Sequence, residues 1–345
     1  MRCKLDRLRT MSVIALDACD AGAIASYCPF HFDASSSRVS KGTSSVHRLR
    51  LAAAAKAAAR RLATSEPEFW SIAARIYRAK IAAPLLEMVP GRVFIDVCPS
   101  LALNTEGIRR EALHILSEFA ADGIGPSRLL IKIPATWEGI RAAEKLQADG
   151  VDTLLTLVFT PDQALACADV GASVISVAIG SVDDRSGWQG QRASNSTSVG
   201  GGALVHAFQE QFLQREYETA VMATDLRSTD TVELLAGADI LLIEPRLLNA
   251  LAFDQHELAR SAPNVRAYPN CRGAQAPRFA NEREFREMMS EDPTASTLLC
   301  EGIQVGVHWH RDLIGALEIA GGALTAEKPV SDARDLVLLR GGGSV

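Results

Sequence analysis

The sequence is poor in several features that mark specialised classes of protein. It contains no run of about 18 apolar residues, so we expect no membrane-spanning helix. Its 345 residues carry a net charge of −5, so we expect neither nucleic acid nor an anionic membrane as a partner. Residues 1–20 lack the apolar core of a secretory signal. Residues 35–63 are rich in Ser and Arg and poor in acids, like a transit peptide, but they lie too far inside the chain. We therefore expect a cytoplasmic protein.

Patterns that would bind a metal or an organic cofactor are also missing. The seven cysteines show no CxxC spacing, so we expect free thiols in a reducing compartment. His308 and His310 form the only close pair of histidines, and no further ligands accompany them at a suitable spacing. No GxGxxG follows the first apolar run, and there is no Walker A motif. We therefore expect neither a metal ion nor a cofactor.

What the chain does have is a regular alternation of strand-like and helix-like segments. Short apolar runs typical of buried strands alternate with amphipathic stretches typical of helices. About eight strands can be counted, at residues 11–16, 30–37, 92–98, 129–133, 153–159, 172–179, 220–224 and 239–243. This alternation predicts parallel α/β connectivity. Without a dinucleotide motif, a (β/α)8 TIM barrel is favoured over a doubly wound sheet.

The same alternation predicts how the chain is divided. We expect residues 1–330 to form a single barrel domain with additional C-terminal helices. Residues 35–45 and 183–202 are polar and predict loops, the second of them rich in Gly and Ser. Residues 331–345 end in GGGSV and predict a flexible tail.

Lys132 is the most informative single residue. It is one of only seven lysines, and it lies within the apolar run LLIKIP, just before a helix that Thr136 can cap. Burial would favour its neutral amine, which is the nucleophile of Schiff-base enzymes. The alternative is a strand-end lysine whose stem packs while its head reaches water. We expect the other six lysines to lie in polar or helical surface contexts, where the amine stays protonated.

Polar residues recur where the predicted strands end. In (β/α)8 barrels the C-terminal ends of the strands build the active site. An aspartate at such an end can instead be a helix cap, and a serine or threonine can simply satisfy backbone groups. An arginine can form a surface ion pair. The residues at or near these ends are Asp17, Asp96, Lys132, Thr156, Ser176 and Arg227.

The segment LLIKIPATWEGIRAAEKL, with its motif IK-x-x-x-TW-x-GI, resembles the lysine strand of the transaldolase family. The resemblance begins in LDRLRTMSVIALDACD, continues in YETAVMATDLR and LAGADILLIEPRLLNALA, and covers roughly residues 5–317. It implies a metal-free class I enzyme of the pentose phosphate pathway. Such an enzyme moves a dihydroxyacetone unit from a ketose phosphate, sedoheptulose 7-phosphate or fructose 6-phosphate, to an aldose phosphate. Sugar phosphates would be its partners, with a homodimer as one candidate assembly.

The resemblance also implies catalytic roles for individual residues. Lys132 would form the Schiff base with the donor carbonyl. Asp17 would handle the proton of the hydroxyl beside the breaking bond. Asp96 stands where the family has glutamate. With Thr156 it would hold the water that exchanges protons during Schiff-base formation.

The residues that would read the substrate depart more from the family pattern. Ser176 would hydrogen-bond the dihydroxyacetone part, and Arg227 would bind the phosphate. Ser37, in DASSSRV, stands where the family has an asparagine that orients the substrate. Ser181, in VAIGS, stands where the family has a phosphate-binding arginine, and Arg185 is a candidate replacement for it.

Three hypotheses follow from these observations. The first, which we prefer, is an active transaldolase. The second is a divergent Schiff-base aldolase or transferase with another, unphosphorylated substrate, and the amide and guanidinium missing at Ser37 and Ser181 favour it. The third is a non-catalytic paralogue, against which the retention of Lys132, Asp17 and Thr156 argues.

Overall fold

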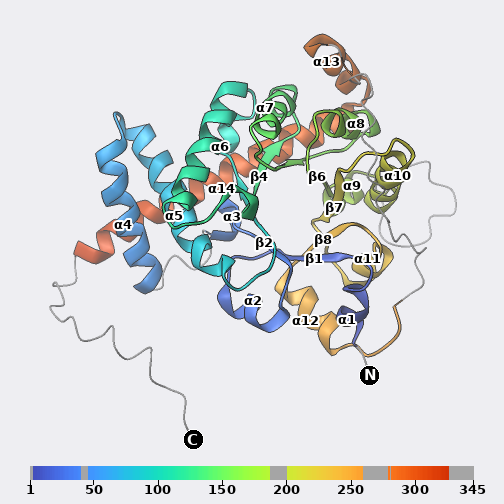
Figure 1. Ribbon diagram of the computed structural model, residues 1–345, viewed down its shortest axis with the longest axis horizontal. Helices are drawn as coiled ribbons and strands as arrows, with labels where there is room; N and C mark the ends of the chain where they lie inside the picture. Colours follow the sequence, from blue (N-terminus) through green and yellow to red (C-terminus); the bar gives the residue numbers. More distant parts are fainter. Residues whose placement is uncertain (1–2, 40–45, 187–199, 259–278, 280, 326–345) are drawn as a thin grey trace, which may run out of the picture.

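Eight parallel strands close into a barrel surrounded by helices (Figure 1). The computed structural model describes residues 3–39, 46–186, 200–258, 279 and 281–325. Each strand pairs with the next one along the chain, and the last pairs with the first. The prediction of a (β/α)8 barrel is confirmed. The strands are β1 (Val13–Leu16), β2 (His31–Asp33), β3 (Val93–Asp96), β4 (Leu129–Pro134), β5 (Thr153–Thr156), β6 (Val174–Ala178), β7 (Ala220–Thr224) and β8 (Ile240–Ile243).

Helices cover the outside of the barrel, and many begin at a side-chain cap. Thr136 caps α7 as predicted, because its Oγ1 accepts a hydrogen bond of 2.9 Å from the backbone N–H of Gly139. The helices are α1 (Lys4–Leu8), α2 (Ala21–Tyr27), α3 (Ser36–Val39), α4 (Val46–Leu62), α5 (Glu66–Leu86), α6 (Thr105–Ala120), α7 (Trp137–Ala148), α8 (Pro161–Asp169), α9 (Ile179–Ser186), α10 (Gly201–Gln214), α11 (Thr229–Leu234), α12 (Pro245–Phe253), α13 (Glu282–Glu291) and α14 (Pro293–Thr325), with short 3-10 turns η1 (Pro99–Leu101) and η2 (Pro126–Arg128).

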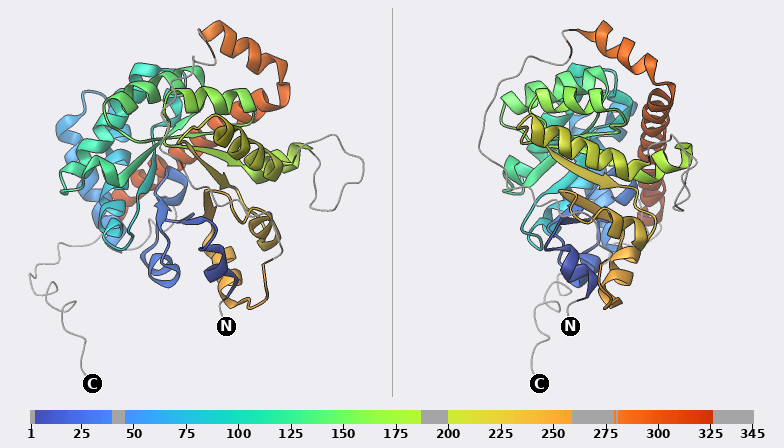
Figure 2. Two further views of the ribbon diagram at one scale, coloured as in Figure 1. Left: turned by 45° about the vertical axis from the view of Figure 1, so that its right-hand side comes forward. Right: turned by 90° about the vertical axis from the view of Figure 1, so that its right-hand side faces the viewer.

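The long helix α14 crosses the C-terminal end of the barrel and packs against α3, α4, α5 and α9 (Figures 1 and 2). Gly302 makes this crossing close, since a Cβ atom there would lie 2.5 Å from the Leu157 side chain, just after β5. On the other side, Lys56 of α4 is buried and donates a hydrogen bond of 2.9 Å to the carbonyl of Leu317. The prediction that all lysines except Lys132 lie at the surface is therefore wrong for Lys56.

Two loop predictions are corrected. Residues 35–45 were expected to form a loop, but they include the short helix α3. Residues 183–202 likewise include the end of α9 and the start of α10. The predicted tail, residues 331–345, lies outside the described residues. Within the described part of the chain, no helix is long and apolar enough to cross a membrane.

Side chains alternate along each strand, and this alternation places polar residues at the C-terminal end of the barrel interior. One inward-facing layer is apolar and fills the barrel interior with Ala15, Phe94, Leu130, Leu154, Val174, Met222, Ile240 and Leu242. Successive side chains of a strand point to opposite faces, so the residue two positions later faces inward again. On seven strands a polar residue lies two positions beyond one of these apolar residues, at or just after the C-terminal end, namely Asp17, Asp96, Lys132, Thr156, Ser176, Thr224 and Glu244. The barrel interior is therefore apolar in its middle and polar at its C-terminal end.

Candidate active site

A cavity of about 610 Å³ opens at the C-terminal end of the barrel. It collects eight of the nine predicted site residues: Asp17, Ser37, Lys132, Thr156, Ser176, Ser181, Arg185 and Arg227. Asp96 is absent from its lining, as far as the chain is described. Helix α14 supplies an apolar wall through Leu298, Val305 and Trp309. No pattern in the sequence indicated that this distant helix would cover the mouth of the cavity.

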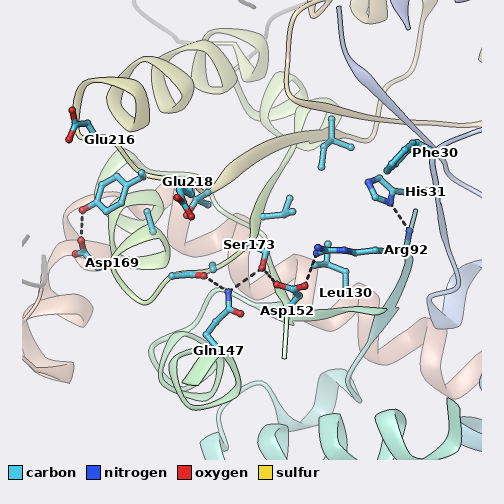
Figure 3. Close-up of a pocket in the computed structure, with 17 residues that line it drawn as sticks. Phe30, His31, Arg92, Leu130, Gln147, Asp152, Asp169, Ser173, Glu216 and Glu218 are labelled. Atoms are coloured by element: carbon cyan, nitrogen blue, oxygen red, sulfur yellow. Dashed lines mark hydrogen bonds and ion pairs between the residues drawn. The ribbon is translucent and has the colours of Figure 1, made fainter. Parts of the chain in front are cut away.

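A larger hollow of about 1030 Å³ lies at the opposite end, around the N-terminal ends of β4, β6, β7 and β8 (Figure 3). Its polar groups are largely bound to one another. Asp152 pairs with Arg92 at 3.0 Å and accepts a hydrogen bond of 2.6 Å from Ser173, which in turn lies 3.2 Å from Gln147 (Figure 3). The N-terminal face of such a barrel serves stability, so we place the active site in the smaller cavity.

Lys132 is held by an aspartate that the sequence analysis did not single out. Its Nζ lies 2.8 Å from Oδ2 of Asp33, at the end of β2, and only 16% and 3% of the two side chains are exposed. Burial acts to lower the pKa of Lys132, but the charge and the hydrogen bond of Asp33 act against it. With smaller contributions from Asp96 and Asp17, the pKa is raised overall. The expectation of a neutral amine in the resting site is therefore wrong, because it counted burial without the counter-ion.

Asp17 is also bound by a residue that the sequence analysis missed. Arg38, in α3, donates from Nε to Oδ1 of Asp17 at 2.6 Å, and its Nη2 binds the other carboxylate oxygen. Burial raises the pKa of Asp17 to about 6, while Arg38 acts to lower it. The available signal was the single basic residue in DASSSRV, directly after the second strand.

Asp96 is turned toward other partners. Arg78 of α5 donates from Nη1 to Oδ1 of Asp96 at 2.6 Å and to its backbone carbonyl at 2.7 Å. The N–H and Oγ of Ser36 each donate to its carboxylate at 3.1 Å. Thr156, the other residue expected to hold the water, accepts a hydrogen bond of 2.9 Å from Ser176. The structure therefore brings Thr156 and Ser176 together, whereas Asp96 is bound by Arg78 and Ser36.

The predicted phosphate-binding arginine, Arg227, is held by carboxylates. Its Nη1 lies 2.6 Å from Asp184 and its Nη2 lies 3.2 Å from Asp225. Ser181 donates to the same Asp225 oxygen at 3.2 Å. The guanidinium packs against Gly180, where a Cβ atom would lie 2.3 Å from Nε. Because about half of the Arg227 side chain is exposed, an incoming anion can compete for it.

The two remaining substrate-binding candidates also lie at the cavity. Arg185 forms an ion pair with Glu301 of α14, so its charge is balanced as well. Ser37 is buried, and its Oγ lies 3.1 Å from Oγ of Ser35. Both side chains reach the cavity, but a serine cannot offer the bidentate amide expected at this position.

The histidine pair in VGVHWHRD is separated by the helix that carries it. His308 is exposed and lies 3.4 Å from Asp312, whereas His310 is buried with its Nδ1 3.5 Å from Ser36. Among the described residues, no group of three or more His, Cys, Asp or Glu side chains could hold a metal ion.

Comparison with known proteins adds to this geometry. The family model described as Transaldolase/Fructose-6-phosphate aldolase matches residues 43–315. A transaldolase of Rhizobium leguminosarum bv. trifolii is 33% identical over 88% of this chain and 93% of its own length. One from Agrobacterium fabrum is 31% identical over 94% of this chain and 99% of its own. The chain belongs to the transaldolase/fructose-6-phosphate aldolase family and is a transaldolase-like transferase.

Proposed function

We propose that the protein transfers a dihydroxyacetone unit from a ketose phosphate to an aldose phosphate through a Schiff base on Lys132. Sedoheptulose 7-phosphate and fructose 6-phosphate are the proposed donors, in a cytoplasmic pentose phosphate pathway. The observation that carries the proposal is the amine of Lys132, which faces the cavity at the C-terminal end of β4 beside Asp17. Neither of these groups requires a metal ion for this chemistry.

The reaction uses the two groups in turn. The amine of Lys132 attacks the donor carbonyl and water leaves, which forms the Schiff base. The Asp17 carboxylate then takes the proton of the hydroxyl beside the bond that breaks, and the aldose departs. The dihydroxyacetone unit stays on Lys132 as an enamine and attacks the acceptor aldehyde. Asp17 returns its proton to the new hydroxyl, and hydrolysis releases the product.

A second candidate is the same transfer with unphosphorylated sugars. The specific observation in its favour is the state of the arginines. The guanidinium of Arg227 is held by Asp184 and Asp225, and Arg185 is paired with Glu301. A phosphate would have to displace these carboxylates, since Ser181 provides no charge of its own. A neutral sugar would not.

Borohydride trapping tests both candidates. The protein is incubated with fructose 6-phosphate, sedoheptulose 7-phosphate, fructose or dihydroxyacetone, reduced, and analysed by intact and peptide mass. Adducts on Lys132 with the sugar phosphates support the first candidate, and adducts with the neutral ketoses alone support the second. An adduct on another lysine would refute the assignment of Lys132. A folded protein that traps no ketose would point to the non-catalytic paralogue.

Lys132→Met is the matched control for this experiment. Methionine keeps the length and the apolar character of the side chain, so the barrel is expected to persist while trapping disappears. Asp33 loses its counter-ion in this variant. Circular dichroism checks that the fold is retained.

A further inference from the structure

We propose that Asp33 is the group that takes the proton from Lys132 and returns it during Schiff-base formation. The resemblance assigns this proton exchange to a water held by Asp96 and Thr156. The inference rests on the proposed Schiff-base reaction and adds a catalytic residue to it.

The first support is the contact itself. Asp33 Oδ2 lies 2.8 Å from Nζ of Lys132, so a proton can pass directly between them without a bridging water. The other oxygen, Oδ1, accepts a hydrogen bond of 2.8 Å from the backbone N–H of Ser35. That bond fixes the orientation of the carboxylate. Asp33 also lines the cavity, so it shares this cavity with a sugar carbonyl that is bound at Lys132.

The second support is the position of Asp96. Its carboxylate receives a charge-assisted hydrogen bond from Arg78, whose side chain is 1% exposed, and two more from Ser36. These bonds engage both carboxylate oxygens of Asp96 with Ser36 and Arg78, whereas Oδ2 of Asp33 is bonded to Lys132 itself. Aspartate is also one methylene shorter than the glutamate of the family, and this carboxylate does not line the described cavity. We therefore assign the proton exchange with Lys132 during Schiff-base formation to Asp33.

The third support is the state of the resting lysine. Because the net effect of its surroundings raises the pKa of Lys132, the amine holds a proton that must leave before attack. A bound sugar displaces water from the mouth of the barrel. A lower local dielectric penalises the ammonium–carboxylate pair relative to the neutral amine and acid. Substrate binding thus favours the transfer that attack requires.

The proposed steps balance in atoms and charge. The Lys132 ammonium gives one proton to Asp33, and the neutral amine adds to the ketone carbonyl. The nitrogen gives a second proton to the carbonyl oxygen, which forms the neutral carbinolamine. Asp33 then protonates its hydroxyl, the C–O bond breaks and water leaves. The iminium cation remains beside a carboxylate that is again negative. Two protons from nitrogen and the carbonyl oxygen make up that water.

The test measures the rate of Schiff-base formation with dihydroxyacetone, by borohydride quenching at successive times and intact mass. Asp33→Asn has nearly the same shape but cannot accept the proton. We expect a loss of about 10²-fold or more, as for other general acid–base groups. Asp96→Asn, the matched control, should lose less than about tenfold. Asp33→Glu, which restores a carboxylate, should recover part of the rate.

Chemical rescue separates proton transfer from a structural role. Asp33→Ala leaves space beside Lys132, and added formate should accelerate its adduct formation, whereas formate should not accelerate the wild type or Asp96→Ala. Rescue is expected even if Asp33→Asn folds poorly, because it compares one protein with and without formate. A rate for Asp33→Asn within about tenfold of wild type, or absence of rescue in a folded Asp33→Ala, would overturn the proposal. Failure of the wild type to trap any ketose would instead overturn the Schiff-base function itself.

Discussion

Replacement of Arg38 by leucine should move the pH dependence of carbon–carbon bond cleavage. Arg38 binds both carboxylate oxygens of Asp17 and acts to lower a pKa that burial raises to about 6. The other charges that face this pair are Asp33 and Lys132, with Glu244 at 4.0 Å from Arg38. Leucine removes the guanidinium that contacts Asp17. Since Asp17 acts as a base only when ionised, a higher pKa moves the loss of activity on acidification to higher pH.

The size of the shift can be bounded from the contact. Two unit charges about 4 Å apart interact by about 4 kcal/mol at an effective dielectric constant near 20. One pKa unit corresponds to about 1.4 kcal/mol, so the pKa of Asp17 should rise by at most about three units. With a pKa of about 6, roughly nine-tenths of Asp17 is ionised at about pH 7. A rise of about two units would leave roughly one-tenth ionised, and activity near neutral pH should fall about tenfold.

The measurement is kcat for donor cleavage between about pH 5 and pH 10, a range that spans both expected pKa values. The acid limb of the Arg38→Leu profile should lie at higher pH by one unit or more, with activity recovering toward about pH 9. Arg283→Leu is the control, because this arginine of α13 has 80% of its side chain exposed and lies outside the cavity lining. Acid limbs that coincide for wild type and Arg38→Leu would refute the electrostatic role of Arg38.

Three further substitutions test the binding and packing of the site. Arg227→Ala should raise KM for phosphorylated donors by roughly tenfold or more, since a charge-assisted contact contributes about 1.5–3 kcal/mol; an unchanged KM for every phosphorylated sugar would exclude the phosphate role. Arg78→Met leaves the partly buried Asp96 without its cation, so urea unfolding should show a free energy of unfolding lower by about 3 kcal/mol. A decrease below about 1 kcal/mol would mean that the pair is unimportant for stability. Gly139→Ala places a Cβ atom 2.0 Å from the backbone oxygen of Pro134, at the end of β4, so α7 must shift. The melting temperature should fall by an amount equivalent to about 1–3 kcal/mol. An unchanged melting temperature would show that α7 can move freely.

Several site positions followed from the sequence because they depend on local periodicity. Apolar runs of a few residues predict strands, and the period of two places the side chain two positions beyond an inward residue on the same inner face. Leu130 therefore implies that Lys132 faces inward, and Leu154 implies the same of Thr156. The cap at Thr136 likewise depends only on its neighbours in the chain. The short helix α3 was missed, since four residues carry too little periodicity to be recognised.

The residues that contact these side chains follow only from the tertiary structure. Asp33 is 99 residues from Lys132 in the sequence, and α14, which walls the cavity, comes more than 100 residues after most of the strands it covers. The sheet places β2 and β4 on either side of β3, and the two charges meet where both side chains face the cavity. The sequence by itself determined that an amine faces the mouth of a barrel. Whether that amine is charged depends on the carboxylate within 2.8 Å of it, because electrostatic energy follows distance in space and not separation along the chain.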